Sequence, residues 1–319
     1  MSAPALTREA PFATRLRAYL RERFPLLGHG LLIASYGSSN QFLARALTRP
    51  GERMHYDWSS LSGAVVLLCL FFHLRVFDEH KDYAEDCRNH PDRVLQRGLI
   101  TLRDLRRFGA VAIATELVLA SLHSLAALTA VLIALGFSVL MLKEFFVGPW
   151  LRRHFLLYAV SHMLIMPLLA LVVFSFATGR WPWTAPGWFW LYACVGFFVT
   201  FNWEVSRKIR TPEEEIEGVD SYTRVFGTYG AAYVVLGIRA VDTLLVLLVG
   251  LHLGLSRWFP AVLVLLFAVC MVGFLQYRFR TSPKAARRME LYAGIYIIAF
   301  DLALAVELAR LHTLRVGAT

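Results

Sequence analysis

The segment FHLRVFDEHKDYAEDCRNHPDRVLQRG, from Phe72 to Gly98, joins the end of an apolar run to a strongly acidic one. After Phe77, six carboxylates follow within sixteen residues: Asp78, Glu79, Asp82, Glu85, Asp86 and Asp92. An apolar run of this length that ends in charged residues is typical of a helix leaving the hydrocarbon core of a membrane. The segment therefore predicts a helix end at an aqueous surface.

The composition of the whole chain favours the same environment. Of 319 residues, 57% are hydrophobic and only 18% are charged, and the mean hydropathy is +0.52. Apolar runs of roughly 17 to 25 residues match the ~30 Å of hydrocarbon that a spanning helix crosses. The alternating polarity of β-barrel strands is not found. We therefore predict an all-α integral membrane protein.

Nine apolar runs are long enough to span the membrane. They lie at about 26–46, 60–77, 107–122, 124–142, 155–177, 187–204, 230–254, 259–278 and 289–309. No linker or change of composition divides the chain, so residues 1–319 are expected to form a single transmembrane domain. The first 24 residues carry five arginines and no secretory signal pattern, and we expect them to be a basic cytoplasmic segment.

Basic residues predict the orientation of the chain. Most of the 33 lysines and arginines fall before the first span or in alternate loops, as expected where those loops face the cytoplasm. This distribution also accounts for the net charge of +10 without a nucleic-acid partner. With nine spans, the N-terminus is cytoplasmic and the C-terminus external, and the expected location is a bacterial plasma (inner) membrane.

The acidic segment has the spacing of a metal site. Asp78, Asp82 and Asp86 recur every four residues, so on a helix their side chains lie close to one face. Like charges so close repel one another, and a divalent cation relieves that repulsion. Mg²⁺ prefers carboxylate oxygens shared with substrate phosphates. We predict Mg²⁺ ligation by these three residues, the alternative being a solvated helix end.

Basic residues beside the acids favour a diphosphate ligand. Asn89, Arg93 and Arg97 follow the three aspartates, and arginine can hold phosphate oxygens with two parallel hydrogen bonds. We predict that all three bind substrate. Taken alone, the two arginines would be ordinary basic residues of a cytoplasmic loop.

The acidic segment resembles the first aspartate-rich motif of the UbiA superfamily of intramembrane prenyltransferases, which reads N-D-x-x-D-x-x-x-D, then N-x-P-x-R-P and a glycine. In this chain Asp78 stands at the asparagine position, and Val94 replaces the last proline. The residues that match the pattern are Asp82, Asp86, Pro91, Arg93 and Gly98.

The resemblance implies nine transmembrane helices around a central cavity, with a cytoplasmic cap formed by the loops after helices 2 and 6. It also implies a Mg²⁺-dependent enzyme that transfers an isoprenoid chain from a polyprenyl diphosphate to an acceptor. Lys143, at the end of the fourth span, matches a basic residue of the family that contacts diphosphate. An interfacial anchor is the other interpretation of this lysine. We predict catalytic roles for Asp82 and Lys143, with Lys143 also binding substrate.

The second acidic segment, from Asn202 to Gly227, stands where the family has D-x-x-x-D. Glu204 is the only acid at the end of the sixth span, with Arg207 and Lys208 one turn later. We predict Glu204 as a metal ligand and the two basic residues as substrate contacts, with ion pairing as the alternative. The run Glu213–Glu215 is interpreted as a helix cap, because Thr211-Pro212-Glu213-Glu214 has the pattern of a capping box.

Two other functions remain open at this point. A divalent-cation transporter also uses acids at a membrane, but it needs ionisable residues along a path across the bilayer. A transferase of phosphoribosyl groups to a polyprenyl phosphate would use the lipid as acceptor. The sequence does not identify the acceptor, the length of the isoprenoid or the oligomeric state.

Overall fold

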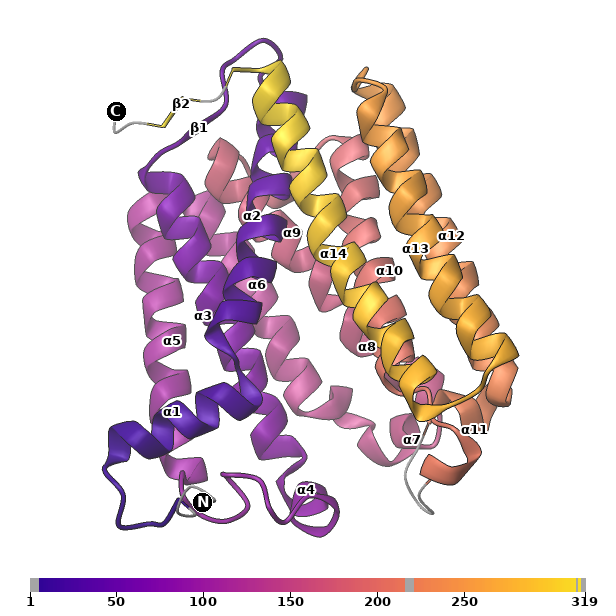
Figure 1. Cartoon of the computed structure of the whole chain (residues 1–319). Helices are drawn as coiled ribbons and strands as arrows, with labels where there is room; N and C mark the ends of the chain where they lie inside the picture. The colour runs from indigo at the N-terminus through magenta and orange to yellow at the C-terminus, as the bar shows by residue number, and fades with distance from the viewer. Residues whose placement is uncertain (1–5, 216–220, 314, 317–319) are drawn as a thin grey trace.

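The structure is a computed structural model that describes residues 6–215 and 221–313, together with the backbone of residues 315 and 316. Its described part is almost entirely helical. The long helices run roughly side by side in a bundle (Figure 1). They are α2 (Leu26–Thr48), α3 (Trp58–Lys81), α5 (Leu102–His123), α6 (Leu125–Leu142), α8 (Phe155–Met163) continued by α9 (Ile165–Thr178), α10 (Gly187–Arg207), α12 (Thr228–His252), α13 (Trp258–Phe279) and α14 (Pro283–Leu311).

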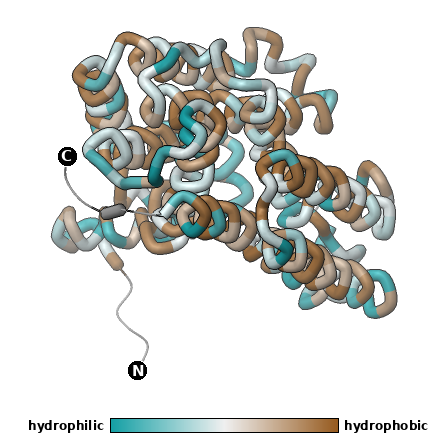
Figure 2. The backbone as a smooth tube through the Cα atoms, turned by 90° about the horizontal axis from the view of Figure 1, so that it is seen from above, coloured by the Kyte–Doolittle hydropathy of each residue, from teal (hydrophilic) through white to brown (hydrophobic). Residues whose placement is uncertain are grey.

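The long helices form a closed ring in chain order. Each contacts the next, and α14 packs against α2, so the last long helix meets the first. Further contacts of α9 with α2 and α3, and of α10 with α14, join helices across the ring. Seen along the bundle, hydrophobic residues predominate around its rim (Figure 2). All nine runs predicted from the sequence fall on these helices.

Six of these helices are long and apolar enough to cross a membrane: α3, α6, the α8–α9 pair, α12, α13 and α14. Helices α2, α5 and α10 coincide with predicted spans but are less apolar. The outer surface of the bundle exposes large apolar side chains such as Leu122, Leu251 and Phe279. This distribution is that of a protein whose solvent is lipid.

Several ionisable side chains within the bundle are buried and are paired or hydrogen-bonded. His73 Nδ1 lies 2.7 Å from Glu116 Oε1, and Arg239 lies 2.9 Å from Asp242. Asp301 accepts hydrogen bonds from neighbouring hydroxyl groups. All five residues are at most 1% exposed, as expected where an unpaired charge would face hydrocarbon.

The predicted span at 155–177 is interrupted. Helix α8 ends at Met163 and α9 begins at Ile165, with Leu164 between them. Pro167 explains the break, because its ring clashes with the carbonyl of the residue four positions earlier, Met163, and it has no N–H to donate. The break separates α8, which carries aromatic side chains near the acidic segment, from the buried helix α9.

Short elements cover the two ends of the bundle. The acidic segments lie at one end with α1, α4, α7 and α11, and the two β-strands lie at the other (Figure 1). Strand β1 pairs with β2 in parallel. The short elements are α1 (Phe12–Arg23), β1 (His55–Tyr56), α4 (Tyr83–Asn89), η1 (Glu144–Phe146), α7 (Gly148–Arg152), η2 (Pro182–Thr184), η3 (Pro212–Glu214), α11 (Tyr222–Phe226) and β2 (Arg315–Val316).

Candidate active site

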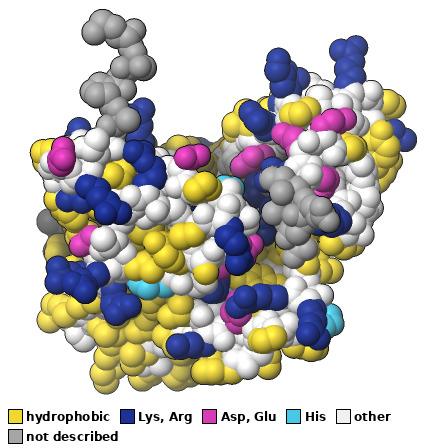
Figure 3. All heavy atoms as spheres, turned by 90° about the horizontal axis from the view of Figure 1, so that it is seen from below, with side chains coloured by type: hydrophobic (Ala, Val, Ile, Leu, Met, Phe, Trp, Pro, Cys, Tyr) yellow, Lys and Arg dark blue, Asp and Glu magenta, His cyan; other side chains and the backbone are white. Residues whose placement is uncertain are grey.

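The first acidic segment forms an almost continuous helical path at the end of α3. Asp82 stands between α3 and α4, and the i to i+4 backbone bonds continue through it: Asp82 N donates to Asp78 O and Asp86 N to Asp82 O, both at 2.9 Å. The three aspartates therefore follow one another along the helical path that their spacing predicts. On the face of the molecule at this end, Asp and Glu side chains lie among many Lys and Arg (Figure 3).

Two of the three aspartates are paired with cations. Asp78 lies 3.4 Å from Lys81 and 3.8 Å from Arg75. Asp86 lies 2.8 Å from Arg93 and 3.7 Å from Arg23. Within residues 6–215 and 221–313, no three His, Cys, Asp or Glu side chains are grouped closely enough to hold a metal. The predicted ligand triple is thus contiguous but not preassembled.

Asp82 is the member of the triple best suited to a cation. Among the described residues it forms no hydrogen bond or ion pair through its side chain. Burial, together with the charges of Asp78 and Asp86, raises its pKa to about 6, although Lys81 acts in the opposite sense. A hard divalent cation would relieve this destabilisation of the ionised carboxylate. The oxygen donors present therefore fit Mg²⁺.

Lys81 is a site residue that the sequence analysis did not identify. Its side chain is only 8% exposed, beside Asp78, and its ammonium group lies 5.3 Å from the ring centroid of Tyr158 on α8. In sequence it reads as one more basic residue of a cytoplasmic loop. Its burial depends on a helix far along the chain, so a local pattern could not reveal it.

Glu204, near the end of α10, is 6% exposed. Arg207 Nε lies 2.5 Å from Glu204 Oε2, and Lys208 Nζ lies 2.8 Å from Oε1. Both carboxylate oxygens are therefore engaged by the two basic residues that follow it. The ion-paired alternative describes the arrangement in the structure, and metal ligation would require these cations to turn toward a substrate.

The two acidic segments converge on α8. Lys208 Nζ lies 5.1 Å from the ring centroid of Phe155, one turn along α8 from Tyr158, on which Lys81 stacks. Burial lowers the pKa of Arg207, but the charges of Glu204 and, more weakly, Asp78 raise it. Residues from α3 and α10, far apart in sequence, thus meet around one short helix.

Other predicted substrate contacts lie outside this cluster. Lys143 and Asn89 are exposed. Arg97 points toward the N-terminal segment, where its guanidinium donates to Leu6 O at 2.7 Å. Of the predicted basic contacts, Arg93, Arg207 and Lys208 are the ones that the structure places on the carboxylates.

Helix α1 covers the first acidic segment. Arg23 donates to the buried Glu79 at 2.6 Å, and Arg15 donates to Leu99 O at 2.8 Å. Glu22 accepts hydrogen bonds from the backbone N–H of Val94. The basic N-terminal segment, expected to be cytoplasmic on topological grounds, therefore also holds the loop after α3 in place.

Gly98, which matches the glycine of the first motif, has a structural reason to be glycine. Its φ is +69°, and a Cβ atom there would lie 2.3 Å from the guanidinium of Arg8. Glycine adopts this left-handed backbone region without the strain that a side chain would cause. The motif glycine thus permits the positive φ of the loop after α3.

The second acidic segment contains the predicted cap. Thr211 and Glu214 form a capping box around η3, and Glu215 accepts hydrogen bonds of 2.6 Å from Ser221 and Thr223. This run therefore stabilises the loop after α10. Residues 216–220 of this predicted segment lie outside the described residues.

Comparison with known proteins identifies the family of this chain. The sequence model of the UbiA prenyltransferase family matches residues 42–298, most of the chain. The chain belongs to the UbiA prenyltransferase family. It is thus an intramembrane enzyme of the UbiA type, and the family predicted from the sequence is confirmed. No curated protein matches the sequence.

Solved structures of UbiA proteins share the fold. A structure of digeranylgeranylglyceryl phosphate synthase in membranes aligns over 93% of this chain and 99% of its own, with a TM-score of 0.62 and 18% identity. An apo UbiA homologue from Aeropyrum pernix K1 aligns over 85% and 96%, with a TM-score of 0.64 and 15% identity. A homologue from Archaeoglobus fulgidus, bound to GPP and Mg²⁺, aligns over 91% and 99%, with a TM-score of 0.50 and 17% identity.

Proposed function

We propose that this UbiA enzyme transfers an isoprenoid chain from a polyprenyl diphosphate to an acceptor, with Mg²⁺ held by Asp78, Asp82, Asp86 and Glu204. The convergence of the two charged segments on α8 is the observation that carries the proposal, because it gathers acids and basic residues at one end of an apolar bundle. A substrate with an anionic head and an apolar chain has the same division. The similar homologue that binds GPP and Mg²⁺ supports this substrate class.

Mg²⁺ and side-chain cations would bind the diphosphate together. When bound, Mg²⁺ would neutralise the departing diphosphate and so stabilise the negative charge that builds there. The carboxylate of Asp82, which forms no ion pair of its own within the described part of the chain, would be its first ligand. Lys81, Arg207 and Lys208 would contribute further positive charge, because each can turn from a carboxylate to a phosphate oxygen.

The basic residues would also replace part of the metal charge that a complete second acidic motif would hold. Only Glu204 remains at the end of α10, and it is outnumbered by Arg207 and Lys208. We therefore expect fewer metal ions and more side-chain cations around the diphosphate than a pair of aspartate-rich motifs would give. Arg93, Arg97, Asn89 and Lys143 are proposed as outer contacts that approach when substrate binds.

The apolar helices would shield the allylic cation left when the diphosphate departs, while the isoprenoid chain lies between helices. We propose nine crossings around a central cavity, with α2, α5 and α10 crossing beside the six more apolar helices. The N-terminus and the site would be cytoplasmic and the C-terminus external, in a bacterial plasma membrane. The loops after α3 and α10, covered by α1, would form the cap of the single domain 1–319.

A cation transporter fits the interior less well. The ionisable groups inside the bundle are buried in pairs or hydrogen-bonded clusters rather than strung along a path, and basic residues at the acidic end would repel a bare cation. A phosphoribosyl transfer to a polyprenyl phosphate would use the same charged end. Reaction assays distinguish this alternative.

The test is a reaction with purified protein, isoprenyl diphosphates of increasing length and Mg²⁺. Release of inorganic diphosphate that depends on an added aromatic or lipid acceptor is the expected result. Consumption of phosphoribosyl diphosphate in the presence of polyprenyl phosphate would instead establish the alternative transferase. Transport of Mn²⁺ into liposomes without either reaction would overturn the proposal.

A further inference from the structure

A cavity of about 410 Å³ lies at the end of the bundle that carries the β-strands, between α2, α3 and α9. Its volume falls within the range of ~300–1,000 Å³ that small-molecule sites occupy. The residues that line it include none of the residues assigned to the active site. The acidic segments lie at the opposite end of the bundle (Figure 1).

The lining changes from apolar to polar along the cavity. Helix α2 runs toward the β-strand end and α3 runs away from it, so residues late in α2 and early in α3 lie nearest that end. Gln41, Asp57 and Ser60 are therefore at the mouth, whereas Ile33 and Leu67 lie deeper in the membrane. Val173 and Phe176 of α9 complete the apolar wall. This gradient suits an amphipathic molecule with its head at the membrane surface.

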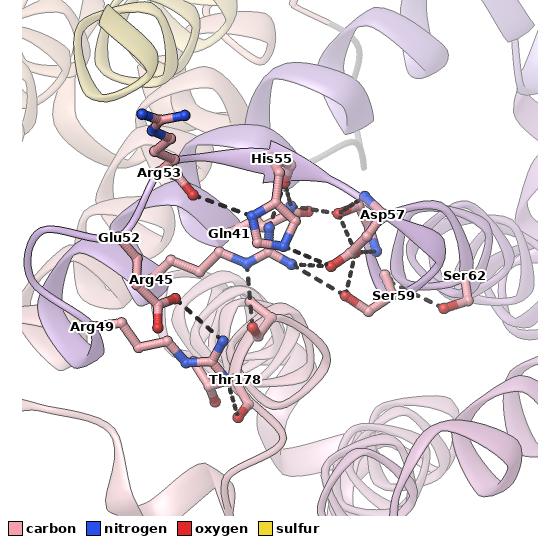
Figure 4. A network of polar contacts seen from close by, with 12 residues as sticks. Gln41, Arg45, Arg49, Glu52, Arg53, His55, Asp57, Ser59, Ser62 and Thr178 are labelled. Atoms are coloured by element: carbon pink, nitrogen blue, oxygen red, sulfur yellow. Dashed lines mark hydrogen bonds and ion pairs between the residues drawn. The ribbon is translucent and has the colours of Figure 1, made fainter. Parts of the chain in front are cut away.

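Hydrogen bonds order the polar mouth (Figure 4). Asp57 accepts from Ser59 Oγ at 2.6 Å and from Ser60 N at 2.9 Å. Gln41 Nε2 donates to Ser60 Oγ at 2.6 Å. The mouth therefore presents hydroxyl and amide groups held in fixed positions, which can donate to or accept from an uncharged polar head.

The charge of the mouth disfavours a phosphate head. Asp57 is neutralised by Arg45, whose guanidinium lies 2.9 Å away and which is 3% exposed. Arg45 also donates to the carbonyl oxygen of His55. Arg45 and His55 are not part of the cavity lining, which contains one carboxylate and no cation among the described residues. A phosphate would meet the Asp57 carboxylate while Arg45 is already engaged by Asp57 and backbone carbonyls. An alcohol would meet hydrogen-bonding groups without that repulsion.

The cavity opens sideways to the lipid. Ala34 on α2 and Ala64 on α3 line it and are exposed on the outer surface, and Leu61 is 56% exposed. Gly37 and Gly63 keep the facing surfaces of the two helices small. A chain can therefore enter between α2 and α3 from the bilayer without crossing the polar mouth.

We propose that this cavity binds a single-chain lipid with an uncharged alcohol head, such as a long-chain or isoprenoid alcohol. The head would lie at Gln41 and Ser60, and the chain would extend toward Ile33 and Leu67. Its orientation is opposite to that of a prenyl diphosphate at the acidic end. The site is therefore separate from the active site and does not depend on the proposed reaction.

The test uses the full chain in lipid nanodiscs and a hexadecanol probe with a diazirine at the end of its chain. After irradiation, mass spectrometry should locate the label in residues 33–41 of α2, 59–67 of α3 or 173–176 of α9, which line the cavity. Unlabelled hexadecanol should compete, and hexadecyl phosphate at the same concentration should not. Labelling elsewhere only, or equal competition by the phosphate, would overturn the proposal.

Two variants fill the cavity. Ala64→Phe adds a ring at an exposed position of the opening, and Gly37→Leu adds a side chain whose Cβ would contact only Leu67, at 3.6 Å. Each should reduce labelling at least about tenfold, as a loss of ~1.4 kcal/mol of binding does. Ala114→Phe, at an exposed alanine of α5, is the matched control and should label like the wild type.

The midpoint of thermal unfolding in detergent shows whether the variants are folded. It should be equal in the wild type and all three variants. Wild-type labelling in both cavity-filling variants would contradict the assignment of the site.

Discussion

Glu204 is a buried carboxylate held by two cations, so its contribution depends on what those cations do when substrate binds. If Glu204 is a metal ligand, Glu204→Gln should lower the activity of the enzyme at least about 100-fold. This loss is comparable to removing one charge-stabilising group from an active site. The Mg²⁺ requirement should also rise. Both quantities are measured as diphosphate release at increasing Mg²⁺ concentration.

Glu214→Gln is the matched control, because Glu214 lies in the same loop but belongs to the capping box around η3. Its activity should change little, and its thermal stability should fall slightly through a weaker cap. If Glu204 serves only as an ion-pair partner, freeing Arg207 and Lys208 should leave binding of diphosphate unchanged or stronger. That outcome would remove Glu204 from the proposed metal site.

Lys81 gives a second prediction at this scale. Its ammonium group is buried between Asp78 and the ring of Tyr158, and a charge-assisted hydrogen bond to phosphate is worth about 1.5–3 kcal/mol. Lys81→Gln should therefore weaken binding of a prenyl diphosphate analogue by about 10- to 100-fold. Lys284→Gln, at an exposed position on α14, should bind as the wild type does. Equal affinities of the two variants would exclude Lys81 from the site.

Individual residues differ in how far sequence predicts them. The placement of Asp78, Asp82 and Asp86 along one helical path follows from their spacing alone, because it is set by backbone geometry. The burial of Lys81 does not, because it is set by Tyr158 on α8. The pairing of Arg97 with the N-terminal segment is equally non-local. Tertiary contacts decide which of several similar basic residues reaches the carboxylates.

The start of α3 shows how one element is anchored. Asp57 caps the helix through Ser60 N and also faces Arg45 and His55. Burial alone would raise the pKa of Asp57, but hydrogen bonds from Ser59 and Ser60 and the charge of Arg45 lower it well below its usual value. The ionised carboxylate therefore stabilises both the helix end and the buried guanidinium.

Asp57→Asn keeps an oxygen for the cap but removes the charge opposite Arg45. Breaking a buried ion pair on one side costs about 3–5 kcal/mol, and partial exposure of Asp57 places this case near the lower value. Thermal unfolding in detergent should show the loss, whereas Asp92→Asn, at an exposed acid, should change stability little.

The sign of the pH dependence follows from the lowered pKa. The contribution of Asp57 is present above the unfolded pKa of ~3.9 and is lost only as the pH falls through the lower folded value. The stability difference between wild type and Asp57→Asn should thus not shrink between about pH 8 and pH 5. A difference that vanishes by about pH 6 would contradict the assignment of Asp57.

At the element scale, apolar length predicted the long helices, because only runs of that size cover the hydrocarbon. The role of α1 was not predictable in this way. Its arginines already had an explanation in the charge asymmetry of the loops, yet Arg23 and Arg15 also bind the loop after α3. The break between α8 and α9 follows from Pro167, whose local signal was present within an otherwise apolar run.

The whole molecule has its charged loops at one end and its β-strands at the other (Figure 1). Because α1 lies at the first end and β2 at the second, an odd number of crossings joins them. Nine crossings with a cytoplasmic N-terminus predict that alkaline phosphatase fused after Thr319 is active and that a fluorescent reporter limited to the cytoplasm is not. The reverse pattern would refute the proposed orientation.

The central claim is that the acidic segment after α3 binds the diphosphate of a prenyl substrate through Mg²⁺. Its most direct test is calorimetric binding of a non-hydrolysable prenyl diphosphate analogue to wild type, Asp82→Asn and Glu85→Gln, with and without Mg²⁺. The control Glu85 is exposed in the same segment. Wild type and Glu85→Gln should bind more tightly with Mg²⁺, and Asp82→Asn should lose that gain, at least about 100-fold in affinity. Undiminished Mg²⁺-dependent binding by Asp82→Asn would contradict the claim.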